Sequence, residues 1–156
     1  MVAYMDHKDL DNRQIGRERA MQIADGVKRV ADRIAKAEDS AGRKEGSVTL
    51  LAATKTRDVG EIMAAIDAGV RRIGENRPQE VTAKARGLLE LCRDRKLALG
   101  TEAVDSDSSS AGVGFHLIGQ LQSNKINKIL PYVDTVESVD GSPLARKLAT
   151  RALAAG

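Results

Sequence analysis

The 156-residue chain has the length of one domain, and its 42% hydrophobic and 30% charged residues are typical of a globular protein. A net charge of +3 is too small for the electrostatic footprint of a nucleic-acid-binding protein, and aromatic residues, at 2%, offer few surfaces for base stacking. No apolar run has the length of a signal peptide or of a membrane span, and the single cysteine, Cys92, allows no disulfide within the chain. We therefore predict a cytoplasmic protein that binds neither nucleic acid nor membrane.

The first predicted element is an amphipathic helix over 13–38, after a flexible segment over 1–12. Its apolar residues recur at spacings of three and four and so share one face: Ile23, Val27, Val30 and Ile34. A glycine-containing loop over 40–47 then leads to a short buried strand over 48–53.

Lys55 follows this strand directly and precedes the next helix. Asp58 is placed to cap that helix, with Glu61 three residues further on, and Gly69 is placed to end it. Lys55 therefore lies at a junction between a strand and a helix.

The same unit of strand, polar tip and helix is repeated along the chain. A second strand is predicted over 70–74, with Glu75 and Asn76 at its carboxyl end. Asn76 is placed to cap a helix over 77–93, in which Val81, Ala85, Leu88 and Cys92 form an apolar stripe.

Residues 100–114 are rich in serine, aspartate and glycine, and we predict a mobile surface loop there. The remaining predicted elements are a strand over 115–119, a helix over 123–130, a strand over 133–139 and a helix from Ser142.

Four strand-helix units in succession predict an α/β fold with a parallel sheet, in a single domain over 13–156. Doubly wound and barrel arrangements both remain open from the spacing alone. In either arrangement the functional residues gather at the carboxyl ends of the strands, where this chain carries Lys55, Glu75, Asn76 and Glu137.

Lys55 is the candidate with the clearest chemistry. An amine fixed at the end of a buried strand can be partly desolvated and held neutral, which suits it to Schiff-base formation with a carbonyl group. The alternative is a solvated lysine that merely flanks a strand, which is common in proteins.

Three stretches of the chain carry motifs of one known family. They are LLAATKTRDVGEIMAAIDAGVRRIGENRPQE, FHLIGQLQSNKINKI and VDTVESVDGSPLARKL, and they contain a K-T motif at Lys55, a G-E-N tripeptide and an H-x-I-G-x-L-Q-x-N-K signature. In these motifs the chain resembles the pyridoxal-phosphate homeostasis proteins, which are related to the amino-terminal domain of alanine racemase. The resemblance runs from about Gly42 to the end, apart from the serine-rich segment. It implies a parallel (β/α) barrel of the alanine racemase amino-terminal type, present as about four β/α units after an N-terminal helix.

The resemblance also implies the roles of three residues. Lys55 would form the Schiff base with pyridoxal 5'-phosphate, Asn76 would hydrogen-bond the phenolic oxygen of the cofactor, and His116 would face its ring. Asn76 as a helix cap and His116 as a hydrogen-bonded core residue are the alternatives. We expect no catalytic residue and no metal ligand.

The chain departs from the family in length. A complete eight-unit barrel needs about 250 residues, so the resemblance covers only the amino-terminal half, without the phosphate-binding loops of the other half. A sheet cut from a barrel has two edges with unpaired backbone groups, which predicts self-association or pairing with a complementary half-barrel.

The predicted function is that of a pyridoxal-phosphate carrier in cofactor homeostasis, without catalytic turnover. One alternative is an enzyme resembling alanine racemase, which would need a second acid or base facing Lys55. The other is a truncated fragment that binds no cofactor.

Overall fold

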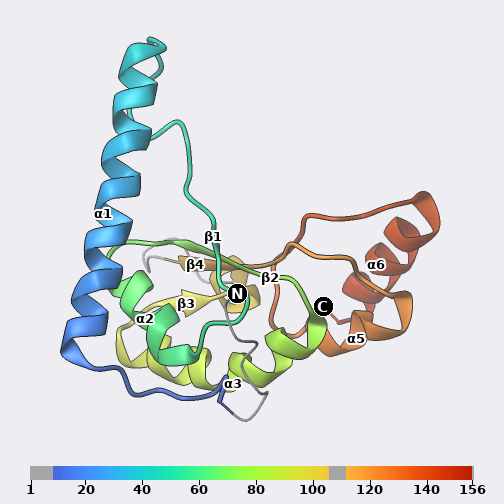
Figure 1. Cartoon of the computed structure of the whole chain (residues 1–156). Coiled ribbons are helices and arrows are strands. Elements are labelled where there is room, and N and C mark those ends of the chain that lie inside the picture. The colour runs from blue at the N-terminus through green and yellow to red at the C-terminus, as the bar shows by residue number, and fades with distance from the viewer. Residues whose placement is uncertain (1–8, 106–111, 156) are drawn as a thin grey trace.

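In the computed structural model, which describes residues 9–105 and 112–155, five strands form one parallel sheet (Figure 1). The strands are β1 (Ala52–Ala53), β2 (Arg72–Glu75), β3 (Ala98–Leu99), β4 (Gly112–Leu117) and β5 (Thr135–Val136). The path through the sheet is β1-β2-β4-β3, and β5 also pairs with β4. All pairs are parallel, which confirms the predicted α/β class.

β3 and β5 share one edge of β4. β3 pairs with the first two residues of β4, and β5 pairs with the last two. The carbonyl oxygens of Val113 and Phe115 accept hydrogen bonds from Gly100 and Asp134 respectively, and alternate residues of a strand direct these groups to the same side. The sheet therefore has four positions side by side, and β3 and β5 lie end to end in the fourth. The four predicted strands correspond to β1, β2, β4 and β5.

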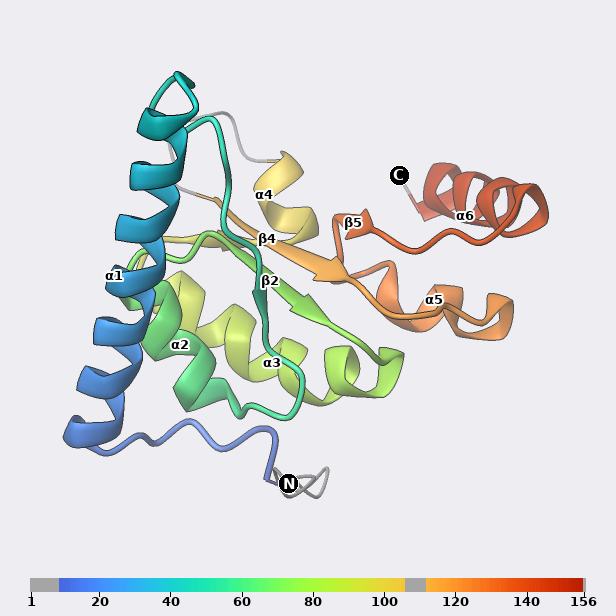
Figure 2. The same ribbon diagram turned by 45° about the horizontal axis from the view of Figure 1, so that its top comes forward.

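Two helices, α2 (Val59–Asp67) and α3 (Pro78–Asp94), cover one face of the sheet (Figure 2). Their apolar side chains join those of the strands in one cluster, whose fully buried members include Ile62, Ile66, Val81, Leu88, Ile73, Phe115 and Leu117. Each such side chain contributes about 1.5–3 kcal/mol through the surface it withdraws from water, so this layer carries most of the core.

The N-terminal cap of α2 is the one predicted from the sequence, whereas that of α3 is not. Asp58 Oδ1 accepts a hydrogen bond from Glu61 N at 2.8 Å, which confirms the predicted cap of α2. The predicted cap of α3 is wrong, because the N-cap is Arg77 and not Asn76. Pro78 stands in the first turn of α3, where its fixed φ suits the helix and its missing N–H leaves one fewer donor to satisfy.

The N-terminal helix α1 (Arg17–Ser40) lies along α2 at one end of the molecule (Figures 1 and 2). Its predicted apolar face is only half-buried, and Val30 on that face is 39% exposed. Glu38 near its end is buried and accepts hydrogen bonds from Gly46 N and Val48 N at 3.0 and 2.6 Å. These contacts bind the following loop to α1, and the strand predicted from residue 48 begins only at Ala52.

Two segments predicted to be flexible contain ordered contacts. Within the loop predicted over 100–114, Thr101–Asp105 form the helix α4 and β4 begins at Gly112, while residues 106–111 lie outside the described part. At the amino terminus, residues 1–8 are likewise outside it, whereas Leu10 is 2% exposed and its carbonyl accepts from Val59 N. The segment 9–12 therefore packs against the start of α2.

The C-terminal elements lie at the opposite end from α1 (Figure 2). They are the 3-10 turn η1 (Ser123–Lys125) and the helices α5 (Ile126–Ile129) and α6 (Ser142–Ala155). Leu144 anchors α6 in the core, whereas Leu153 is 85% exposed. Among the residues that the structure describes, no helix is long and apolar enough to cross a membrane.

Candidate functional site

The two faces of the sheet carry different chemistry because side chains alternate along each strand. Thr54, Glu75 and the apolar core residues of the strands point toward α2 and α3. The other face, which we name the Lys55 face, carries Ala53, Gly74 and His116 side by side across β1, β2 and β4. Lys55 follows Ala53 in this alternation, at the carboxyl end of β1.

Lys55 occupies a tight turn and is exposed. The turn is closed by a hydrogen bond from Arg57 N to Thr54 O at 3.0 Å, and Thr56 within it has a φ of 64°. Within residues 9–105 and 112–155, the Lys55 amine has no hydrogen bond and no ion pair. The partial burial expected from the sequence is therefore not found, and the amine is free to meet a ligand from solvent.

Asn76 lies at the end of the neighbouring strand and is half-buried. Its backbone is in close contact with Gly119, where an added Cβ would collide with the Asn76 carbonyl oxygen. This close approach explains why the H-x-I-G signature needs glycine at that position, and it brings the carboxyl ends of β2 and β4 together.

His116 lies one level deeper on the same face, opposite Gly74, and is 6% exposed. Its Nδ1 lies 2.8 Å from Glu137 Oε1, and its Nε2 lies 3.6 Å from Asp134 Oδ1. Both ring nitrogens are thus directed at carboxylates that flank β5. These contacts agree with the second interpretation of His116, a hydrogen-bonded core residue.

A buried charged cluster behind the sheet was missed from the sequence. Lys84 of α3 is fully buried, with its Nζ 2.7 Å from Glu75 Oε1 and 3.6 Å from Glu80 Oε2. The same Nζ donates to Thr54 O at 3.1 Å. Lys84 falls three residues after Val81 and four before Leu88, so the helical period already placed a lysine on the apolar stripe. We name Glu75, Glu80 and Lys84 the rear cluster.

The carboxyl group of Glu75 is the unusual member of the rear cluster. The pKa of Glu75 is raised to about 7: burial raises it most, the neighbouring Glu80 carboxyl group raises it as well, and the charge of Lys84 lowers it. Burial also acts on Glu80, yet the neighbouring Glu75 carboxyl group and the Lys84 charge leave the pKa of Glu80 below its ordinary value. Within the rear cluster, Glu75 therefore keeps its proton to a higher pH than Glu80 does.

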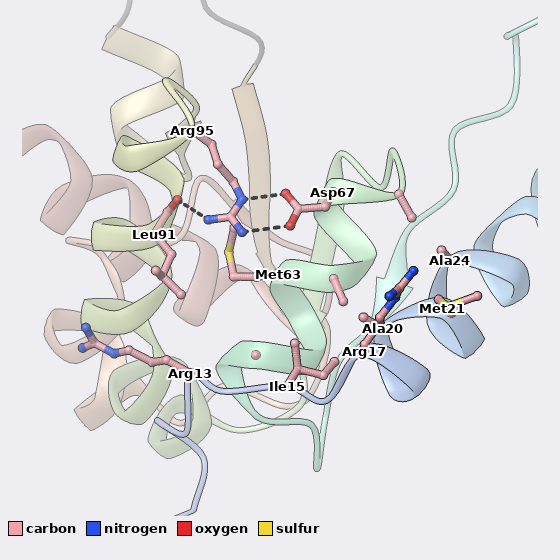
Figure 3. A pocket seen from close by; sticks show the side chains of 13 residues that line it. Arg13, Ile15, Arg17, Ala20, Met21, Ala24, Met63, Asp67, Leu91 and Arg95 are labelled. Atoms are coloured by element: carbon pink, nitrogen blue, oxygen red, sulfur yellow. Dashed lines mark hydrogen bonds and ion pairs between the residues drawn. The ribbon is translucent and has the colours of Figure 1, made fainter.

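The hollows of the surface that involve α1 lie away from Lys55. One, of about 430 Å³, is lined by α1, α2 and α3, with Met21 and Met63 among its apolar residues (Figure 3). Arg95 closes one side through hydrogen bonds to Asp67 at 2.6 and 2.8 Å. A second, of about 580 Å³, lies between α1 and residues 45–50. Lys55, Asn76 and His116 line neither of them.

A parallel sheet covered by helices on one face, with polar residues at the carboxyl ends of its strands, is the arrangement of (β/α) barrel proteins, whose ligand sites lie at these strand ends. No family model matches the chain. It is 34% identical over 126 residues to the pyridoxal phosphate homeostasis protein of Escherichia coli strain K12, covering 81% of this chain and 47% of the relative. The protein of the same name from Mycobacterium bovis is 30% identical over 138 residues, covering 88% and 50%.

Solved structures are also similar to the chain. An unknown protein from Bifidobacterium adolescentis matches with a TM-score of 0.88 at 62% identity, over 95% of this chain and 56% of the other. PipY of Synechococcus elongatus PCC7942, solved with PLP bound, matches with a TM-score of 0.51 at 31% identity, over 78% and 47%.

The chain is thus a homologue of the pyridoxal phosphate homeostasis proteins, and the resemblance predicted from its motifs is confirmed. It spans about half the length of the curated relatives it matches.

Proposed function

We propose that this chain carries pyridoxal 5'-phosphate as a Schiff base on Lys55 and takes part in cofactor homeostasis in the cytoplasm, without catalytic turnover. The observation that carries the proposal is the exposed Lys55 amine, which has no partner among the described residues and stands at the carboxyl end of β1. The relatives support it, because they are named for the homeostasis of this cofactor and not for a reaction.

The residues present fit the aldehyde end of the cofactor. An accessible primary amine can attack an aldehyde carbon, so that a carbon–nitrogen bond forms and the carbonyl oxygen leaves as water. The linkage is reversed by water, as a carrier requires. When bound, the cofactor supplies an electron-withdrawing ring conjugated to that bond.

Asn76 and His116 have different parts in the proposal. The Asn76 side chain is not needed as a helix cap, since Arg77 holds that position, which supports its use as a donor to the cofactor. His116 is held by Glu137 and Asp134, so we propose that it forms part of the protein surface beneath the cofactor ring. The phosphate group has no such assignment among the described strand ends.

An absorbance titration tests the proposal. Purified protein mixed with pyridoxal phosphate should develop the Schiff-base band at the edge of the visible spectrum, and a Lys55→Ala variant should not. Lys36→Ala, which removes an exposed lysine from α1, is the matched control and should behave as the wild type. A band of equal strength in Lys55→Ala would overturn the proposal.

A second assay tests the absence of turnover. L-Alanine incubated with the cofactor-loaded protein should keep its optical purity. Loss of optical purity with the wild type but not with Lys55→Ala would instead establish a racemase-like enzyme.

A further inference from the structure

The turn that carries Lys55 adopts a conformation that its own sequence does not favour. Thr56 has a φ of 64°, in the left-handed region that such turns normally fill with glycine, and threonine is branched at Cβ. Thr54 N makes the last ladder bond to Gly74 O at 2.9 Å. Beyond this bond, contacts from outside the sheet must hold the turn in place.

Those contacts come from the rear cluster. Lys84 Nζ donates to Thr54 O at 3.1 Å, and Thr54 Oγ1 donates to Glu75 Oε1 at 2.6 Å. On the other side of Lys55, Thr56 N donates to Glu80 Oε2 at 3.3 Å. The residues before and after Lys55 are therefore both tied to buried charges of β2 and α3.

We propose that Glu75, Glu80 and Lys84 are positioning residues for Lys55, which hold its turn from behind the sheet and direct its amine toward the Lys55 face. The inference rests on the proposed function, because it matters for binding only where Lys55 takes the cofactor. None of the three side chains needs to touch the ligand, since all three are buried on the opposite side.

The proton of Glu75 makes this support depend on pH. Glu75 Oε2 is buried and has no hydrogen-bond partner among the described residues, so as a protonated oxygen it can donate to Glu80. The charged groups around Glu75 are Glu80 and Lys84 of α3, and from β1 it meets the Thr54 hydroxyl. Loss of the proton leaves two carboxylates beside one ammonium group, and their repulsion displaces Glu80 from Thr56 N.

Glu75→Gln separates the two protonation states. Glutamine keeps an oxygen that accepts from Thr54 and Lys84, and its amide donates to Glu80 as the protonated acid does. The variant should therefore hold the turn in its low-pH form at every pH.

The first measurement uses the protein without cofactor. The backbone amide resonance of Thr56 should titrate with a midpoint near pH 7 in the wild type and stay flat in Glu75→Gln. The amide of Val48, which donates to Glu38 on the far side of the molecule, is the internal control and should not move in this range. A Thr56 amide that is equally flat in both proteins would overturn the inference.

The second measurement follows cofactor affinity from pH 6 to 8.5. The ratio of wild-type Kd to Glu75→Gln Kd should be close to unity at the low end and rise severalfold above neutral pH. Lys84→Met should weaken binding at every pH at temperatures where it is fully folded, whereas Lys28→Met, at an exposed ion pair of α1, should not. If binding depends on Lys55 but the ratio of the two Kd values stays constant from pH 6 to 8.5, the inference about the rear cluster is overturned and the proposed function stands. Absence of Lys55-dependent binding in the wild type would overturn the proposed function. The titration of the Thr56 amide would then decide the inference about the rear cluster.

Discussion

At the scale of single residues, the rear cluster links protonation to folding. The pKa of Glu75 is raised to about 7 in the folded protein against an ordinary 4.5, so between these values the folded state binds more protons than the unfolded state. The free energy of unfolding therefore falls as pH rises through this window. A shift of this size corresponds to roughly 3 kcal/mol. Glu80 acts in the opposite direction, but only below its ordinary pKa.

We therefore expect urea denaturation to give a wild-type stability that decreases between pH 5 and about pH 7.5. Glu75→Gln should flatten the curve over that range, since glutamine does not titrate. A Glu75→Gln curve that runs parallel to that of the wild type would contradict the assignment.

Lys84 provides a second prediction at this scale. Lys84→Met keeps the length of the side chain but leaves two buried carboxyl groups without a counter-charge, and it should lower the free energy of unfolding by about 3–5 kcal/mol. Lys28→Met, the exposed control, should have no measurable effect. Equal losses in the two variants would show that the buried pair adds no specific stability.

The position of Lys55 at the end of a strand could be predicted from the sequence, whereas its surroundings could not. Its motif and its place after β1 were visible in the sequence, whereas its exposure depends on what covers the Lys55 face. Lys84 could have been predicted to lie on the buried stripe from its helical period. Its i, i+4 partner Glu80 was also visible in the sequence. The contact with Glu75 was not, because it depends on how α3 packs against β2.

At the scale of elements, the glycine of the H-x-I-G signature marks where two strand ends meet. Gly119→Ala would drive a Cβ into the backbone of Asn76, which cannot move without disturbing β2. We expect the variant to lose stability and, with the strand ends displaced, cofactor affinity.

Gly26→Ala is the matched control for this prediction. Gly26 lies inside α1, where an added Cβ has its closest neighbour, a side-chain nitrogen of Arg29, at 3.8 Å. Alanine there should raise stability by about 0.5–1 kcal/mol through helix propensity. Thermal unfolding should therefore shift in opposite directions for the two variants, and a shift in the same direction would contradict the proposed clash.

The type of each long element could be predicted, whereas short elements and caps could not. The helical periods of α1 and α3 and the cap at Asp58 were strong local signals. β3 was missed because two residues carry no periodicity, and its burial comes from its position against β4. The Asn76 cap was wrong because Pro78 starts α3 one residue later than the asparagine rule predicted.

At the scale of the whole molecule, both lateral edges of the described sheet are open. β1 pairs only with β2, and β5 pairs only with β4. Unpaired backbone groups at such edges favour association, so we expect sedimentation to report a mass that increases with protein concentration.

A monomer over the whole concentration range would contradict this prediction for the chain alone. Mixing the chain with a polypeptide that corresponds to the remaining half of a relative would then test pairing with a complementary half-barrel. Formation of a defined one-to-one complex would support such pairing.

The rear cluster also has a consequence for how this protein can change. The supports of the Lys55 turn lie on the helix side of the sheet, and the proposed ligand-binding surface lies on the other side. Placement of the reactive amine and recognition of the molecule that reacts with it are thus encoded by separate sets of residues. Mutations on the Lys55 face can therefore alter which ligand is bound while the amine keeps its position. New ligands can be accommodated without any change in the residues that position Lys55.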